Sequence, residues 1–176
     1  MRKLKITELE RLSPQAYKES KKIPLVVVLD HVRSLNNVGS VFRTSDAFRV
    51  EAVYLCGITA CPPHPEIHKT ALGAEDTVEW VYFQDTLEAV DKLRKKGYII
   101  CSVEQAKGSV MLDKLLLDKT NKYAVIFGNE VKGVQQMVVD NSDMCIEIPQ
   151  YGTKHSLNVS VSAGIVIWDI SKQLSD

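Results

Sequence analysis

Leu25-Val26-Val27-Val28-Leu29 is a continuous apolar run with three valines at its centre. A strand with one face in water alternates apolar and polar residues, whereas a run without polar residues is typical of a strand buried on both faces. Such strands occur in parallel sheets, where the connecting helices cover both faces of the sheet. This stretch therefore predicts an α/β fold.

Strands and helices alternate along the rest of the chain. Further buried strands are expected at 52–56, 78–83, 98–103, 123–127 and 144–148. Helices are expected at 37–48, 66–72, 86–96, 134–139 and 157–174. This alternation predicts a mainly parallel sheet with helices on both faces, and no linker or repeat divides the chain into separate domains.

The composition is that of an ordinary globular protein, with 45% apolar and 25% charged residues. No apolar run is long enough to cross a bilayer, and the first residues, Met1 to Lys5, lack the apolar core of a signal peptide. A cytoplasmic protein is therefore expected. The four cysteines show no C-x-x-C spacing, which favours buried, reduced thiols over a disulfide framework.

The charge is balanced overall but uneven along the chain. Twenty-two basic and twenty-two acidic residues cancel, whereas residues 1–22 carry seven Lys or Arg against three Glu. This segment is expected to be a helical arm, with Ser13-Pro14 as a helix start. A basic arm could follow the phosphates of a nucleic acid, and a solvated charged helix explains the same charges equally well.

Three polar segments each follow an expected strand. They are Asn37-x-Gly39-x-x-x-Arg43, Gly128-Asn129-Glu130 and Ser156-Leu157-Asn158. Ligands of open α/β sheets bind beyond the carboxyl ends of the strands, so the three segments are expected to meet there. Together they would gather an arginine, a carboxylate, two amides and a hydroxyl, a set suited to binding a polar ligand and moving a proton.

Each segment also has a purely structural interpretation. The alternatives are a helix cap at Asn36 or Asn37, a surface pair of Arg43 with Asp46, a favourable charge at a helix start for Glu130, and a helix cap at Ser156. Asn37 and Arg43 are six residues apart, roughly 600° around a helix, so they converge only if Asn37 lies at or before the helix start.

Several common site types do not fit the sequence. The spacing Gly128 to Gly133 resembles a phosphate loop, but the following Lys-Ser/Thr is absent. There is no G-x-S-x-G for a serine hydrolase and no G-x-G-x-x-G after the first strand for a Rossmann-type oxidoreductase. His64 and His68 have the spacing of helical metal ligands, but Pro65 breaks that geometry, so no metal site is predicted.

Taken together, the segments resemble the three signature motifs of the SpoU-type (TrmH-like) RNA ribose 2′-O-methyltransferases of the SPOUT superfamily. Three motifs in this order and spacing are specific, whereas each alone is not. The similarity begins near residue 23 and runs to the end of the chain. The matching stretches are Leu29-Asp30…Asn37-x-Gly39-x-x-x-Arg43-Thr44-Ser45-Asp46-Ala47, Ile126-Phe127-Gly128-Asn129-Glu130-x-x-Gly133 and Ile148-Pro149-x-x-Gly152-x-x-x-Ser156-Leu157-Asn158-Val159-Ser160-Val161-Ser162.

The resemblance implies a SPOUT domain over residues 23–176 with a deep trefoil knot at its C-terminal end, which no sequence pattern would suggest because threaded chains are so rare. It also implies a pocket for S-adenosylmethionine, formed by the loops after three of the strands. The residues expected to hold the donor, mostly through their backbone, are Val103, Gly128, Ile148 and Leu157. Gln150 stands where the family often has methionine, at a lining position.

The resemblance further implies the roles of the polar residues. Arg43 is expected to be essential, either as the base or as a clamp on the alkoxide and phosphate, with Asn37 orienting it. The remaining catalytic residues, which hold the attacking hydroxyl, are Glu130, Ser156 and Asn158. RNA contacts are expected from the basic arm and from Arg33, Arg43, Lys132 and Lys154.

The substrate would be tRNA, which a small protein can bind at its single-stranded loops, or rRNA. A homodimer through helix 157–174 is implied as well, and the apolar residues that nearly encircle this helix agree with it. A catalytically silent RNA-binding module on the same scaffold is the alternative, but such a protein would have no chemical reason to keep all five polar positions filled.

Overall fold

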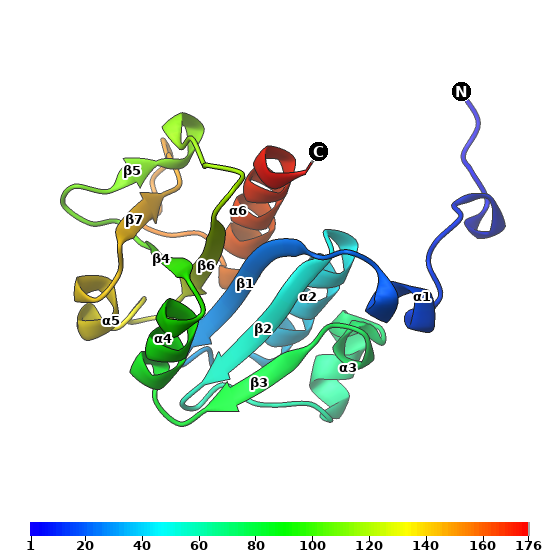
Figure 1. Cartoon of the computed structure of the whole chain (residues 1–176), viewed down its shortest axis with the longest axis horizontal. Helices are drawn as coiled ribbons and strands as arrows, with labels where there is room; N and C mark the ends of the chain where they lie inside the picture. Colours follow the sequence, from blue (N-terminus) through cyan, green and yellow to red (C-terminus); the bar gives the residue numbers. More distant parts are fainter. Residues whose placement is uncertain (176) are drawn as a thin grey trace.

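In the computed structural model, which describes residues 1–175 and all their side chains except that of Ile6, seven parallel strands form one sheet (Figure 1). Their order is β3-β2-β1-β6-β4-β7-β5, and every neighbouring pair is parallel. The strands are β1 (Ile23–Asp30), β2 (Val50–Cys56), β3 (Trp80–Phe83), β4 (Tyr98–Val103), β5 (Val110–Met111), β6 (Lys122–Phe127) and β7 (Met144–Glu147). The predicted parallel α/β sheet is confirmed.

Helices cover both faces of this sheet. The α-helices are α1 (Pro14–Glu19), α2 (Leu35–Ala47), α3 (Pro65–Ala71), α4 (Thr86–Lys95), α5 (Gln136–Asp140) and α6 (Val159–Leu174). Short 3₁₀ turns are η1 (Ile6–Glu8), η2 (Ala74–Asp76) and η3 (Leu112–Lys114). Apolar residues of α2, α3 and α6 share one core cluster with the sheet, and those of α4 and α5 share the cluster on the opposite face.

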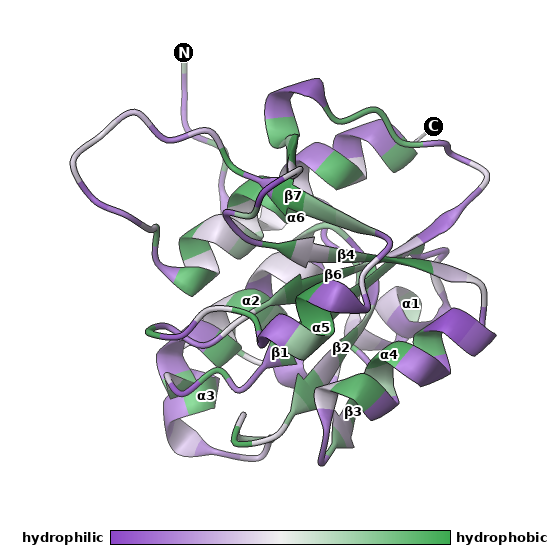
Figure 2. Ribbon diagram, turned by 90° about the vertical axis from the view of Figure 1, so that its left-hand side faces the viewer, coloured by the Kyte–Doolittle hydropathy of each residue, from purple (hydrophilic) through white to green (hydrophobic). Residues whose placement is uncertain are grey.

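The β1 run explains why the sheet is covered on both sides. Leu25, Val27 and Leu29 belong to one core cluster, and Val26 and Val28 belong to the other. All five are fully or almost fully buried, and burying such side chains contributes about 1.5–3 kcal/mol each. Figure 2 shows the same arrangement, with hydrophobic residues gathered in the central strands and hydrophilic residues in the loops.

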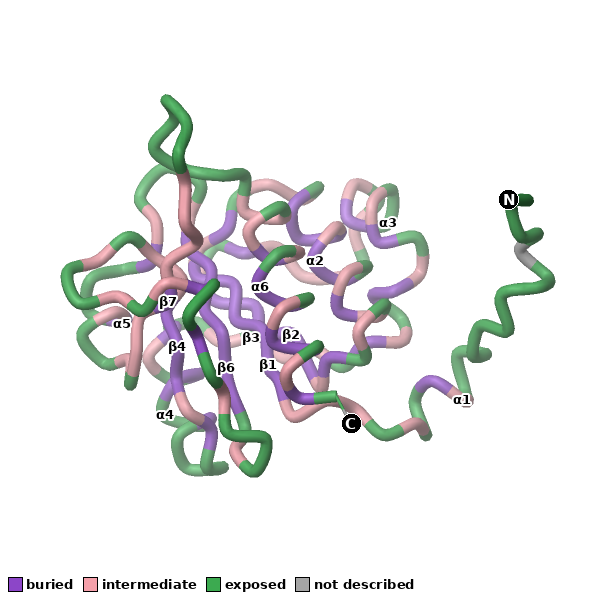
Figure 3. Tube along the Cα trace, turned by 90° about the horizontal axis from the view of Figure 1, so that it is seen from above, coloured by how far each residue is buried: buried purple, intermediate pink, exposed green. Residues whose placement is uncertain are grey.

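The N-terminal arm, residues 1–22, extends away from the sheet at its beginning and joins it only near its end (Figure 3). Ser13 caps α1 by accepting a hydrogen bond from the backbone N–H of Ala16, as the Ser-Pro pair predicts. Tyr17 is buried and anchors α1 on the domain, and the Lys22 ammonium lies 4.2 Å from the centre of its ring. The contact of the arm with RNA stays a prediction.

Two helices begin at other residues than expected. Ser34, rather than Asn36 or Asn37, caps α2, because its hydroxyl accepts from the Asn37 backbone N–H at 3.3 Å. Asn158, rather than Ser156, caps α6, because its side-chain carbonyl accepts from the Ser160 backbone N–H at 2.9 Å. No helix among residues 1–175 combines the length and the apolar character that crossing a membrane requires.

Candidate functional site

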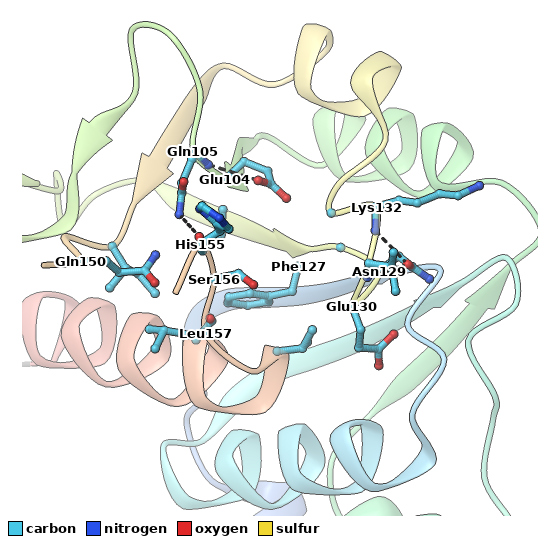
Figure 4. Close-up of a pocket in the computed structure, with 17 residues that line it drawn as sticks. Glu104, Gln105, Phe127, Asn129, Glu130, Lys132, Gln150, His155, Ser156 and Leu157 are labelled. Atoms are coloured by element: carbon cyan, nitrogen blue, oxygen red, sulfur yellow. Dashed lines mark hydrogen bonds between the residues drawn. The ribbon is translucent and has the colours of Figure 1, made fainter. Parts of the chain in front are cut away.

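A cavity of about 320 Å³ opens where β4, β6 and β7 end (Figure 4). Its lining comes from three segments that are distant in the sequence: 103–105, 127–133 and parts of 148–162. Since the strands are parallel, their carboxyl ends meet at one edge of the sheet, where ligands of such folds bind. Val103, Gly128, Ile148 and Leu157, the four residues expected to hold a methyl donor, all line this one cavity.

Glycine is required at position 128 because the chain folds back on itself there. A Cβ on Gly128 would lie 2.0 Å from the carbonyl carbon of Gly133, far inside van der Waals contact. The backbone N–H groups of Asn129 and Gly133 each donate to the other residue's carbonyl, at 3.0 and 2.9 Å. We call residues 128–133 the glycine turn. The close approach that Gly128 permits is to the turn's own backbone.

Glu130 ties the glycine turn to the start of α2. Its carboxylate accepts hydrogen bonds from the backbone N–H groups of Arg33 and Ser34, both at 2.9 Å, and from the side-chain amide of Asn37 at 3.0 Å. Partial burial acts to raise the pKa of Glu130, but these hydrogen bonds outweigh it and lower the pKa below its usual range. The side chain is therefore a carboxylate at neutral pH.

The first polar segment is only partly at the cavity. Asn37 is buried in the first turn of α2 and reaches the cavity through its bond to Glu130. Gly39 instead serves helix packing, because a Cβ there would lie 2.2 Å from the Thr70 hydroxyl oxygen of α3.

Arg43 is exposed two turns further along α2 and does not line the cavity. The surface pair of Arg43 with Asp46 does not form, since the Asp46 carboxylate accepts from the Thr77 hydroxyl at 2.8 Å. Within residues 1–175 the Arg43 guanidinium has no acidic or aromatic partner. In a single chain this group therefore lies in solvent and is free to interact with another molecule.

The third segment brings Ser156 and Leu157 to the cavity, whereas Asn158 is engaged as the cap of α6 and does not line it. The Gln105 side-chain amide donates to the backbone carbonyl of His155 at 2.6 Å and thereby fastens this segment to the loop after β4 (Figure 4). Lys154 is exposed and outside the lining.

Three residues that line the cavity were not predicted as site residues from the sequence: Glu104, Gln105 and His155. Glu104 accepts a hydrogen bond from the backbone N–H of Val134 at 2.9 Å, next to the glycine turn. Its position could have been predicted, because it follows the expected strand 98–103 directly and so lies at the same edge of the sheet as the other segments.

The lining combines apolar side chains and backbone groups with two carboxyl side chains, Glu104 and Glu130. This character suits a polar ligand that has an apolar part and a positive charge. Among residues 1–175, no group of three or more His, Cys, Asp or Glu gathers in a way that would hold a metal ion.

The model of the SpoU rRNA Methylase family matches residues 24–168. The chain belongs to this family. An uncharacterized tRNA/rRNA methyltransferase of Borreliella burgdorferi is 31% identical over 157 residues, which are 89% of this chain and 68% of that protein. The 23S rRNA (guanosine-2′-O-)-methyltransferase RlmB of Neisseria meningitidis is 31% identical over 85% of this chain, which covers 59% of RlmB. The chain thus spans about three fifths to two thirds of the length of these curated relatives.

Solved structures agree with the family. The crystal structure of the A. aeolicus TrmH/SpoU tRNA modifying enzyme has a TM-score of 0.79 and 26% identity, over 91% of this chain and 81% of that one. The rRNA methyltransferase from Sinorhizobium meliloti, solved with bound AdoMet, has a TM-score of 0.80 and 25% identity, over 94% of this chain and 62% of that one.

Proposed function

We propose that this protein transfers a methyl group from S-adenosylmethionine to a ribose 2′-hydroxyl of RNA. The observation that carries the proposal is the cavity at the ends of β4, β6 and β7, where all four residues expected to hold the donor come together. Membership of the SpoU family and the AdoMet-bound Sinorhizobium meliloti relative support it.

The cavity fits this donor chemically. S-adenosylmethionine has an apolar adenine, a polar sugar and amino-acid part, and a positively charged sulfonium group, which is what makes its methyl group transferable. Ile148 and Leu157 provide apolar contact, the backbone of the glycine turn provides hydrogen-bonding groups, and Glu104 and Glu130 complement positive charge.

The reaction is an in-line displacement in which the ribose 2′-oxygen forms a bond to the methyl carbon as the carbon–sulfur bond breaks. The 2′-hydroxyl is a poor nucleophile, so its proton must leave and the developing charge must be stabilised. Arg43 is the proposed essential group. A free arginine is too basic to accept a proton, which favours a clamp on the alkoxide and the neighbouring phosphate.

The other catalytic residues position the reactants. Glu130 and Asn37 hold the start of α2 against the glycine turn, and this contact sets where α2 lies relative to the donor. Ser156 has an exposed hydroxyl at the cavity and is the proposed contact to the ribose, while Asn158 holds the first turn of α6 behind it. Such positioning can contribute several kcal/mol to catalysis.

A homodimer through α6 is part of the proposal. Val161, Ile165 and Trp168 expose large apolar side chains on this helix, and Trp168 is 53% exposed. Because α2 packs against α6, a second copy that covers α6 would also approach the exposed face of α2 that carries Arg43. In such a dimer Arg43, which does not line the donor cavity of its own chain, could complete the donor cavity of the partner subunit.

The C-terminal knot is also proposed. The chain leaves β7 at the edge region of the sheet and must cross to α6 on the face opposite to α5. The bond between Gln105 and His155 holds the crossing segment against the loop after β4, as a threaded segment would require.

The RNA is proposed to be a tRNA or an rRNA; the relatives include a tRNA modifying enzyme and a 23S rRNA methyltransferase. Calorimetry should give binding of S-adenosylhomocysteine and none of NAD. Mapping of 2′-O-methyl groups on tRNA and rRNA, with and without the gene, should reveal one lost methyl group. Donor binding without any lost methyl group would favour the silent RNA-binding alternative.

A further inference from the structure

A second cavity, of about 750 Å³, lies on the other side of the glycine turn, where β1, β2 and β6 end. Its lining includes His31 after β1, Ile58 after β2, and Met137 in α5. Arg33 and Lys132 line it as well. The proposed mechanism makes no use of this cavity.

Apolar side chains are unusually exposed around the second cavity. Ile58 is 62% exposed, Met137 is 64% exposed and Val131 is 79% exposed. Single exposed apolar residues are common on proteins, but several around one hollow are typical of a binding site. None of the three contributes to the buried core, so the fold does not account for them.

Two unpaired cations accompany this apolar surface. Within residues 1–175, neither the Arg33 guanidinium nor the Lys132 ammonium has an acidic or aromatic partner. Figure 4 shows Lys132 extending away from Ser156 and His155, that is, away from the donor cavity. Apolar contacts beside two free cations complement a ligand that has a flat base and a phosphate.

The cavity is held in shape without a ligand. The Asn129 side-chain amide donates to the His31 carbonyl at 2.9 Å, and the Gln135 side chain and backbone both donate to the buried Asp30 carboxylate, at 2.7 and 2.8 Å. Gly57 leaves the space that the His31 ring occupies, since a Cβ there would lie 2.2 Å from it. A preformed site loses less conformational entropy on binding.

The two cavities share one wall. Asn129, Val131, Lys132 and Gly133 line both, and Glu130 between them binds the backbone of Arg33. An RNA chain that places one ribose at the donor cavity therefore brings a neighbouring nucleotide to the second cavity. This adjacency favours RNA over a protein partner as the occupant.

We propose that the second cavity receives the base of a nucleotide that flanks the methylated one. Ile58 and Met137 contact the base, and Arg33 and Lys132 contact the phosphates on either side of it. The inference rests on the proposed function and adds to it a recognition site for single-stranded RNA. Because the base meets aliphatic side chains and the nearby amides of Gln135 and Gln136 are bonded within the protein, the site tolerates different bases.

The first test compares the double variant Ile58→Ser/Met137→Ser with Leu116→Ser, a control that removes a more exposed leucine that lines neither cavity. The KM for the RNA should rise roughly tenfold in the double variant, which corresponds to about 1.4 kcal/mol. The affinity for S-adenosylhomocysteine and the kcat should stay within about twofold of the wild type, since neither residue lines the donor cavity. An unchanged KM overturns the proposal.

The second test places an abasic residue at each position next to the methylated nucleotide. In the wild type one such position should raise the KM roughly tenfold, and in the double variant the same change should add less than about threefold, because the contact is already lost. Additive penalties at every position overturn the proposal.

These results are distinct from a failure of the proposed function. If the wild type methylates no tRNA or rRNA, that function is wrong, and the second cavity is then judged by filter binding of the same RNAs without a donor. Weaker binding by the double variant, with binding by Leu116→Ser unchanged, supports the RNA site. Equal binding by the wild type and the double variant overturns it and leaves the cavity to a protein partner.

Discussion

The Glu130 carboxylate accepts a hydrogen bond from the side-chain amide of Asn37, at 3.0 Å and across 93 residues of sequence. With the two backbone N–H groups of Arg33 and Ser34, this bond makes Glu130 the link between the glycine turn and α2. Positions of both cavities therefore depend on one side chain, because the donor cavity includes the glycine turn and the second cavity includes Arg33.

Glu130→Gln should weaken the fold as well as the site. A glutamine keeps one carbonyl acceptor but turns an N–H₂ group toward the other donors, so at least one of the three bonds is lost. Hydrogen bonds to charged groups contribute about 1.5–3 kcal/mol, and because Glu130 is exposed to solvent the expected loss is reduced to about 1–2 kcal/mol. Denaturant unfolding at pH 7 measures this difference.

The matched control is Glu66→Gln. Glu66 also pairs on the surface, with Lys69 at 2.5 Å, but both side chains are largely in water. Such a pair contributes little, so this variant should unfold within about 0.5 kcal/mol of the wild type. Equal losses of unfolding free energy in the two variants would contradict the role of Glu130 as the link between the glycine turn and α2.

The stabilisation by Glu130 should depend on pH in one direction. Its pKa is lower in the folded chain than in the unfolded chain, where it is about 4.3, so folding favours the carboxylate. The contribution is fully present above about pH 5 and is lost as the pH falls through the folded pKa. The difference in unfolding free energy between wild type and Glu130→Gln should thus be smaller at pH 3 than at pH 6, and its pH dependence should be that of about one titrating group. A constant difference would contradict it.

Gly128→Ala should disrupt the donor cavity by steric overlap alone. The new Cβ would meet the carbonyl carbon of Gly133 at 2.0 Å, so the glycine turn must open and the lining must shift. The affinity for S-adenosylhomocysteine in calorimetry should fall at least tenfold, or about 1.4 kcal/mol. Gly152→Ala is the control, because a Cβ there has no atom within 4 Å. A normal affinity of Gly128→Ala would show that the turn does not shape the donor site.

The β1 run predicted the fold because a strand that is buried on both faces has an apolar side chain at every position. The apolar runs at 98–103, 123–127 and 144–148 likewise predicted where the strands end, and therefore that Val103, Gly128 and Ile148 lie at one edge of the sheet. These features could be predicted because each depends on residues that are neighbours in the sequence.

The helix starts could not be predicted in this way. Ser34, Asn36 and Asn37 are all residues that cap helices, and the local sequence does not choose between them. The choice depends on Glu130, which engages the Asn37 side chain from 93 residues away and leaves Ser34 as the cap. The face of α2 that Arg43 occupies follows from that start.

The second cavity was also beyond prediction from the sequence. Ile58 and Met137 belong to segments that read as ordinary apolar positions next to a strand and in a helix. Their exposure appears only when β1, β2 and β6 are placed side by side.

Trp168→Lys should convert a dimer to a monomer. The substitution places a charge in the exposed apolar surface of α6, where burial against a second copy would be costly without a partner for the charge. Light scattering after size exclusion should report twice the chain mass for the wild type and the single-chain mass for the variant. Leu116→Lys, at another highly exposed position, should stay dimeric. A wild type that is monomeric at all concentrations contradicts the proposed dimer.

Arg43→Ala should abolish methyl transfer and leave donor binding and stability nearly unchanged. The side chain is exposed and has no polar partner in the single chain, so its removal breaks no hydrogen bond or ion pair within residues 1–175. Turnover should fall by at least about a hundredfold, because the group stabilises charge that appears only in the transition state. Lys95→Ala, at an exposed position in α4 on the opposite face of the sheet, is the control and should keep its kcat. Near-normal turnover of Arg43→Ala would remove this residue from the mechanism.

Mixing Arg43→Ala with a variant whose donor cavity is disrupted tests which copy receives Arg43. At a donor concentration too low to load Gly128→Ala, an equal mixture of Arg43→Ala and Gly128→Ala, allowed to exchange subunits, contains about one half mixed dimers. If Arg43 serves the donor cavity of the partner subunit, each mixed dimer has one intact site, and activity returns to about a quarter of the wild-type value. If Arg43 serves its own chain, both sites of a mixed dimer stay incomplete and no activity returns. The exposed place of Arg43 on α2, outside the cavity lining of its own chain, predicts the first result.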